Sequence, residues 1–304
     1  MNNLSTRLYL WFIGSLLLII AGWTIYSYSR PSQPETEPVT FNGQRAYADV
    51  ETQVAFGPRI PGTEGHTKIR EWMGDELVAA GWQVEVQESE ALGHPIQNIV
   101  AKRSEVPPQI IIGAHYDTRM FADNDSDPEN HKKPVPGAND GGSGVAVLLE
   151  LARTLPEDTV PIWLVFFDAE DNGNIEGWDW TLGSPEFVRN NPVQPQAVVI
   201  VDMVGDADLN IYQEHNSNPD LTAKLWQTAK SLGYGSKFIS EYKHSMQDDH
   251  RPFLQAGIPT VLIIDFDYPY WHTLQDTPDK VSAESLQAVG ATLHAWVMQQ
   301  SEQP

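Results

Sequence analysis

Three carboxylates follow one apolar run of the chain within four residues. The stretch VFFDAEDNG, residues 165–173, begins with the apolar residues of a strand and then places Asp168, Glu170 and Asp171 close together. Carboxylates crowded at a strand end repel one another and are costly to remove from water. A cation bound among them would offset that cost, so this stretch predicts a metal site.

Further acids and histidines lie directly after other apolar runs. Because the chain contains no cysteine, any metal must be held by oxygen and imidazole ligands. Residues that come from several strands can meet if the carboxyl ends of those strands share one edge of a sheet. The candidate ligands of a zinc ion are Asp140, Asp171 and His272, and His115 and Asp202 could hold a second ion.

Four strand-length runs precede these residues. They are rich in β-branched and aromatic residues and apolar on both faces, as strands of parallel or mixed sheets are. Between them, helical periodicity extends over residues 63–81 and over the C-terminal stretch that contains Leu293 and Trp296. The alternation predicts a three-layer α/β/α sandwich with a central mixed, mostly parallel sheet. The four runs are PQIIIGAHYD, PIWLVFFDAED, AVVIVDMVGD and PTVLIIDFD.

The composition excludes one class of partner. The 304 residues carry a formal net charge of −22, and no basic face for a phosphate backbone is visible, so nucleic acid is not expected as a partner.

The N-terminal region differs from the rest of the chain. The run from Leu8 to Tyr26 has no charged residue and approaches the ~20 residues that span a bilayer. We therefore expect a membrane anchor or signal segment over residues 1–28 and a Pro-rich acidic linker over 29–44. A single zinc-dependent catalytic domain is expected over 45–304. Whether the segment is cleaved stays open, and in both cases the catalytic domain is expected outside the cytoplasm.

The order of six segments resembles that of the zinc aminopeptidase (M28-type) superfamily over roughly residues 45–300. Within that superfamily the chain looks most like the bacterial branch of the glutaminyl-peptide cyclotransferases, or glutaminyl cyclases. QDDHRPFL, the tryptophan directly before His272 and the insertion GWDWTLGS favour that branch. The six segments are GAHYDTR, GANDGGSGVAVLLELAR, FFDAED, VDMVG, QDDHRPFLQAGIP and WHTLQDT.

The resemblance implies an activity: conversion of the N-terminal Gln of peptides and proteins to pyroglutamate, with release of ammonia. It also implies one Zn²⁺ ion and, we expect, a monomeric catalytic domain. Many relatives have Glu-Glu where this chain has Glu170-Asp171, which shortens one ligand but preserves an oxygen donor. The implied roles are metal binding by Asp140, Asp171 and His272, proton transfer by Glu170, a hydrogen-bonded network of Asp202 and Asp248 beside the substrate, and a pocket wall at Trp271.

Two other functions remain open at this point. A two-metal zinc aminopeptidase would use His115, Asp140 and Asp202 for one ion and Asp140, Asp171 and His272 for the other, and ligand spacing alone does not exclude it. A non-catalytic binding module would be expected to have lost a ligand or the proton shuttle, and no such loss is visible.

Two smaller features are less specific. Arg119 could orient a substrate carboxylate, orient a neighbouring acid, or form a structural salt bridge. The stretch DNDSDPEN, residues 123–130, begins like a calcium loop, but Pro128 and Pro134 occupy the positions of its glycine and final glutamate. We therefore expect a solvated acidic loop that covers the mouth of the site.

Overall fold

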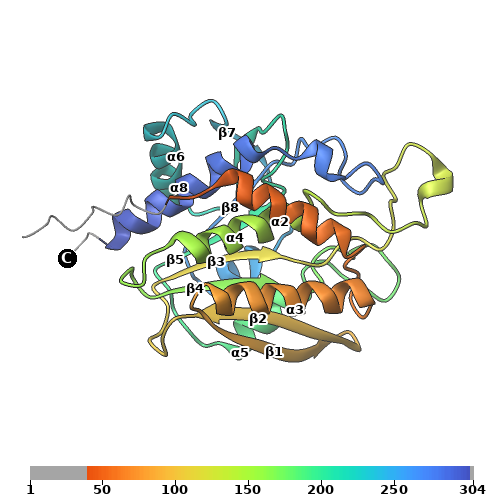
Figure 1. The fold of residues 1–304 in the computed structure, drawn as a ribbon, viewed down its shortest axis with the longest axis horizontal. Helices are drawn as coiled ribbons and strands as arrows, with labels where there is room; N and C mark the ends of the chain where they lie inside the picture. The colour runs from red at the N-terminus through yellow and green to blue at the C-terminus, as the bar shows by residue number, and fades with distance from the viewer. Residues whose placement is uncertain (1–39, 302–304) are drawn as a thin grey trace, which may run out of the picture. The chain divides into compact units, whose positions relative to one another are not determined.

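A six-stranded sheet runs through residues 40–301, the part of the chain that the computed structural model describes (Figure 1). Its strand order is β1-β2-β4-β3-β5-β8. The β4-β3, β3-β5 and β5-β8 pairs are parallel, and the β1-β2 and β2-β4 pairs are antiparallel. The strands are β1 (Gln83–Ala91), β2 (His94–Lys102), β3 (Ile110–His115), β4 (Ile162–Phe167), β5 (Ala197–Asp202) and β8 (Thr260–Ile264).

The four apolar runs of the sequence form β3, β4, β5 and β8. Successive side chains of these strands enter two different hydrophobic clusters: Ile110 and Ile112 belong to one, and Ile111 belongs to the other. A strand buried on both faces must be apolar throughout, which is why these runs show no alternation. The expected three-layer sandwich around a mixed, mostly parallel sheet is confirmed.

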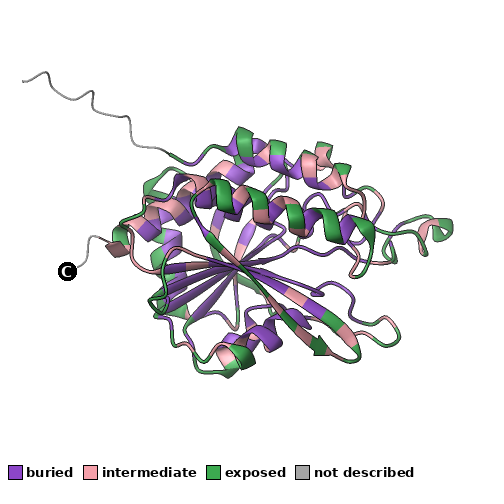
Figure 2. Ribbon diagram, turned by 60° about the horizontal axis from the view of Figure 1, so that its bottom comes forward, coloured by how far each residue is buried: buried purple, intermediate pink, exposed green. Residues whose placement is uncertain are grey.

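Helices cover both faces of the sheet, and buried residues concentrate in the strands and on the inward sides of the helices (Figure 2). One layer contains α2 (Gly43–Ala55), α3 (Glu64–Ala79), α4 (Gly142–Thr154) and α8 (Ala283–Ser301), and the other contains α5 (Gly183–Asn190) and α7 (Arg251–Gln255). Helix α6 (Pro219–Ser231) packs against α8 and against the two-stranded parallel sheet of β6 (Ile211–Glu214) and β7 (Phe238–His244). Short 3₁₀ turns lie at Pro128–Asn130 and Pro278–Lys280.

Helix α4 lies directly on the sheet because a glycine allows it to approach. A Cβ atom at Gly144 would lie 2.7 Å from the carbonyl oxygen of Val201 and 2.8 Å from Cβ of Ala114. Helix α4 begins two residues after Asp140, so this close contact also fixes the position of Asp140 above the strand ends.

The folded unit begins slightly earlier than the sequence suggests. Phe41 is buried, and Asn42 caps α2 by accepting hydrogen bonds from the backbone N–H groups of Gln44 and Arg45. These residues fall within the stretch expected as a linker. The polar composition of that stretch did not indicate that Phe41 would be buried in the core.

The expected anchor, residues 1–28, lies outside the described residues. Among residues 40–301, none of the helices combines the length and the apolar character that a membrane crossing requires.

Candidate active site

Four neighbouring strands deliver the candidate residues to one edge of the sheet. Strand β3 ends at His115 and β5 ends at Asp202, while Glu170 and Asp171 follow β4. The loop after β8 leads to His272. Because β4, β3, β5 and β8 are parallel neighbours, their carboxyl ends lie side by side, as the sequence predicted.

Asp140, Asp171 and His272 form a group that fits a zinc ion. One ligand atom from each lies within 4.8 Å of the others. His272 Nε2 is 2.8 Å from Asp171 Oδ1 and 3.7 Å from Asp140 Oδ2. Oδ2 of Asp140 and Oδ2 of Asp171 are buried and have no hydrogen-bond partner among the described residues. Buried carboxylate oxygens without a partner are costly, and a cation would satisfy both.

His115, Asp140 and Asp202 form a second group of the same kind. His115 Nε2 lies 3.2 Å from Asp140 Oδ1 and 3.1 Å from Asp202 Oδ1, and its Nδ1 lies 3.4 Å from Asp117 Oδ1. Burial opposes protonation, but the three acids together raise the pKa of His115 well above its ordinary value. The arrangement therefore accommodates either a hydrogen-bonded imidazolium or a second ion.

A small cavity of about 180 Å³ opens beside the first group. Glu170 and Asp248 face it and are almost fully buried. Burial raises the pKa of Glu170 well above its ordinary value, with a further rise from the charge of Asp248 and an opposing effect of His115. The pKa of Asp248 is raised in the same way by burial and by the charge of Asp202. The lining residues are Asp140, Glu170, Asp171, Trp180, Asp202, Met203, Met246, Gln247, Asp248, Ile264, Phe266 and Trp271.

These raised pKa values matter for chemistry because a carboxyl group that is reluctant to ionise can both accept and return a proton. The structure thus brings every residue predicted for the site into one place, around or directly behind this cavity. Phe266, Met203 and Met246 complete its apolar wall. Sequence reasoning missed these three residues, because their apolar character alone does not distinguish them from core residues.

Two buried acids outside the cavity accept hydrogen bonds from the backbone of site residues. Asp117 accepts hydrogen bonds from the N–H groups of Glu170 (2.9 Å) and Asp171 (3.2 Å). Asp276 accepts bonds from the N–H groups of Asn139 (2.8 Å) and Asp140 (3.2 Å). Asp117 lies two residues beyond the end of β3, and Asp276 lies in the segment after His272; neither acid was given a role from the sequence.

The backbone itself is unusual at three site positions. Ala169, Met203 and His272 have φ angles of 54°, 47° and 57°, in the left-handed region that residues other than glycine rarely adopt. Ala169 immediately precedes Glu170, and Met203 immediately follows Asp202. Such conformations persist where the surroundings impose them, and they aim the adjacent side chains out of the sheet and toward the cavity.

The acidic loop and Arg119 lie against the site and not in the cavity. Arg119 is buried and forms an ion pair with Asp123, so the neighbouring acid is its partner. Asp123 Oδ1 lies 3.4 Å from His272 Nδ1. Asp125 accepts bonds from the backbone N–H groups of Asp127 and Leu274, which ties the loop to the segment after His272.

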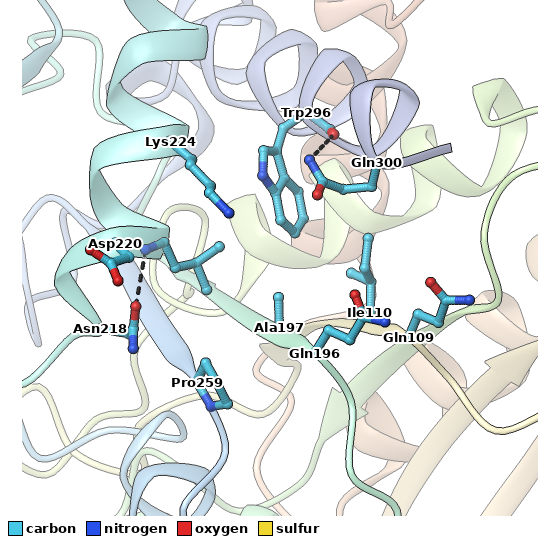
Figure 3. A pocket seen from close by; sticks show the side chains of 11 residues that line it. Gln109, Ile110, Gln196, Ala197, Asn218, Asp220, Lys224, Pro259, Trp296 and Gln300 are labelled. Atoms are coloured by element: carbon cyan, nitrogen blue, oxygen red, sulfur yellow. Dashed lines mark hydrogen bonds between the residues drawn. The ribbon is translucent and has the colours of Figure 1, made fainter. Parts of the chain in front are cut away.

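A larger cavity of about 430 Å³ opens at the other end of the sheet (Figure 3). Ile110, Ala197 and Pro259 place it at the amino ends of β3, β5 and β8, and Lys224 and Trp296 lie over it. No histidine and no group of acids from the described residues lines this cavity. Its lining acid, Asp220, does not form a metal ligand set by itself, so the site is assigned to the smaller cavity.

Comparisons with known proteins agree with this geometry. A family model described as Peptidase family M28 matches residues 98–297. The structure of Tannerella forsythia glutaminyl cyclase is similar to 85% of this chain and 98% of that chain, with 38% identity and a TM-score of 0.78. A Zn-dependent exopeptidase from Parabacteroides distasonis matches 87% of this chain and 99% of its own, with 32% identity and a TM-score of 0.80.

The similarity extends to a curated relative. The glutaminyl-peptide cyclotransferase of Gloydius blomhoffii is 25% identical over 79% of this chain and 77% of its own length. The chain belongs to peptidase family M28, in the glutaminyl-peptide cyclotransferase branch that the bacterial glutaminyl cyclases represent.

Proposed function

We propose that this protein converts the N-terminal Gln of peptides and proteins to pyroglutamate and releases ammonia. The observation that carries the proposal is the 38% identity to a bacterial glutaminyl cyclase over 98% of that chain. The cavity agrees with it: about 180 Å³ is less than the ~300 Å³ at which ligand pockets usually begin, so it has room for one side chain.

Asp140, Asp171 and His272 would hold the zinc ion, with one ligand from each residue. When bound there, zinc acts as a Lewis acid toward the γ-amide carbonyl of the substrate. The unpartnered oxygens of Asp140 and Asp171 support this assignment, because they are acceptors without a donor among residues 40–301.

Glu170 is the proposed proton shuttle. The α-amine nitrogen of the substrate bonds to its own γ-carbonyl carbon, and the bond from that carbon to the amide nitrogen breaks. Glu170 accepts the proton that the amine gives up and returns it to the departing ammonia. Its raised pKa suits the first step, since a stronger carboxylate base accepts the proton more readily.

Asp248 and Asp202 are proposed to orient the amine, and Trp271 to wall the pocket. Both acids line the cavity next to Glu170, so they can accept hydrogen bonds from the substrate nitrogen. Trp271 packs against Phe266 with ring centroids 5.0 Å apart. Apolar walls exclude water, and ring closure of a correctly held substrate then requires mainly orientation.

A pair of matched peptides tests the proposal. The full chain is incubated with zinc and with two peptides that differ only in an N-terminal Gln or Leu, followed by mass spectrometry. We expect the Gln peptide to lose one ammonia and the Leu peptide to stay intact. Replacement of Glu170 by Gln should lower the rate about 10²–10⁴-fold, the usual contribution of general acid–base catalysis, without loss of zinc.

The alternative is a two-metal aminopeptidase. The close approach of His115, Asp140 and Asp202 favours it, and so does the similarity to a Zn-dependent exopeptidase. Release of free Leu from the second peptide, with zinc bound at two equivalents, would support the peptidase and contradict the cyclotransferase.

We also propose that residues 1–28 attach the protein to a membrane and that the catalytic domain works as a monomer outside the cytoplasm. The uncharged run from Leu8 to Tyr26 supports the attachment. Fractionation of cells that produce the full chain should recover it with the membranes, and recovery in the aqueous fraction would contradict the attachment.

A further inference from the structure

Arg119 is an almost fully buried cation near the site, yet it does not line the cavity. Its side chain is 2% exposed. It donates four hydrogen bonds: Nε to Asp123 Oδ1 (3.1 Å), one terminal nitrogen to Asp123 Oδ2, and the other to the carbonyl oxygens of Asp171 (3.0 Å) and Gly173 (2.8 Å). A guanidinium is the side chain that can satisfy such a planar set of acceptors.

Asp123 connects this guanidinium to His272. Its Oδ1 lies 3.4 Å from His272 Nδ1, on the side of the imidazole opposite Nε2. A carboxylate beside Nδ1 favours the tautomer that carries its proton at Nδ1 and leaves Nε2 with a free lone pair for a metal. The next residue reinforces the contact, because the backbone N–H of Asn124 donates to the carbonyl oxygen of His272 (3.2 Å).

Trp180 lies beside both Arg119 and His272. Its ring lies 5.1 Å from the Arg119 guanidinium carbon and stacks on the His272 imidazole, with centroids 6.0 Å apart and planes 18° from parallel. His272 is therefore held by a carboxylate at one ring atom, by an indole on its face and by a backbone bond at its carbonyl. Its left-handed φ of 57° requires such external support.

We propose that Arg119 and Asp123 form an outer-sphere clamp that positions two of the three metal ligands, Asp171 through its carbonyl and His272 through Nδ1, and thereby sets the affinity of the site for zinc. Neither residue touches the cavity, so both are positioning residues and not catalytic ones. The inference rests on the proposed zinc site. It extends that site to an ion pair whose acid, Asp123, is the first residue of the stretch 123–130 that begins like a calcium loop.

The test measures zinc affinity of the full chain by competition with a chelator, with the melting temperature of the metal-free form measured in parallel. Removing a partner of a metal-binding histidine typically weakens metal binding about 10–100-fold. We expect a loss of that size for Asp123→Ala. The loss should be smaller for Asp123→Asn, because an amide oxygen still accepts the Nδ1–H bond without supplying the charge. Asp123→Ala also leaves the buried Arg119 guanidinium without its ion-pair partner, so we expect it to lower the melting temperature of the metal-free protein, and zinc affinity is therefore measured well below that temperature.

Two matched controls separate positioning from general damage. Asp127→Asn changes an acid of the same loop that does not contact His272, and it should bind zinc as the wild type does. Arg119→Lys should weaken binding, because an ammonium cannot reach Asp123 and both carbonyls together. Arg153→Lys changes an ion-paired arginine in the last turn of α4, at the end remote from Asp140, and it should leave zinc affinity unchanged.

The outcomes are distinct. Zinc binding by Asp123→Ala within about twofold of the wild type, far below the ~10–100-fold expected of such a partner, would overturn the clamp while leaving the zinc site intact. Failure of the wild type to bind zinc, or binding that Asp140→Ala does not reduce, would overturn the zinc site and the clamp with it.

Discussion

Glu170 is buried beside several other carboxylates. The largest cause of its raised pKa is burial, and Asp248, Asp249 and Asp171 raise it further while His115 opposes them. A general base acts only when it is unprotonated in the free enzyme, so kcat/KM must fall as the pH drops through this raised pKa. The neighbouring acids thus determine where the acid limb of the pH profile lies.

Replacing Asp248 by Asn removes one of these negative neighbours. The pKa of Glu170 should then fall, and the acid limb of kcat/KM for a Gln peptide should move to lower pH. The plateau should drop by about 10–100-fold, the equivalent of one hydrogen bond to a charged group. A pH profile of kcat/KM measures both effects, with Asp127→Asn as a control that should shift neither. An acid limb that stays in place or moves to higher pH would contradict the assignment of Glu170 as the base.

Among the elements, those with a strong local signal were predictable. The runs that became β3, β4, β5 and β8 are apolar on both faces, and α8 buries Leu293 and Trp296 as its periodicity indicated. The strand order was not predictable, because pairing depends on contacts between distant segments. The contact between Asp123 and His272 was not predictable for the same reason, because it joins two loops that are distant in sequence and adjacent only in the folded protein.

Strand β6 ends in a buried acid that holds the loop next to Asp248. Glu214 accepts hydrogen bonds from the backbone N–H groups of Asn216 (2.9 Å), Ser217 (2.8 Å) and Met246 (3.1 Å), and it lies 3.5 Å from His250 Nε2. Burial alone would raise its pKa, but these donors and His250 lower it to about 2.

Replacing Glu214 by Gln should lower the free energy of unfolding at pH 7 by about 2–3 kcal/mol, because an amide turns a donor toward buried N–H groups. The lowered pKa predicts the sign of the pH dependence. Between about pH 4.5 and pH 2 the unfolded wild type binds a proton that the folded form does not, so its stability falls as the pH falls. The variant lacks this contribution.

Urea unfolding of the wild type and of Glu214→Gln at pH 7 and pH 4 measures the difference between their free energies of unfolding. This difference should be smaller at pH 4, because the wild type has lost part of the contribution of its charged Glu214. Glu241→Gln, an exposed acid on β7, is the matched control and should show neither effect. An equal loss at both pH values would mean that the charge of Glu214 does not contribute to stability.

For the molecule as a whole, the position where the folded unit begins can be tested by truncation. The folded unit begins at residue 40, and Phe41 packs so closely on α8 that a Cβ at Gly290 would lie 2.0 Å from its ring. The backbone N–H of Asn42 donates to Glu150 on α4 (2.9 Å). The first residues of the unit thus join α2, α4 and α8, far in sequence but adjacent in the fold.

Deletion of residues 1–39 should leave kcat/KM and the melting temperature unchanged and should release the protein from membranes. Deletion of residues 1–43 should instead cost about 3–5 kcal/mol, the usual effect of losing a buried phenylalanine, and about 1 kcal/mol more for the lost cap of α2. Phe41→Ala in the full chain is the matched variant and should reproduce most of that loss, as measured by urea unfolding. If the shorter fragment were as stable as the longer one, the folded unit would begin after residue 43, as the sequence alone suggested. Such a result would mean that the burial of Phe41 against α8 does not stabilise the fold, contrary to the usual effect of burying an aromatic side chain.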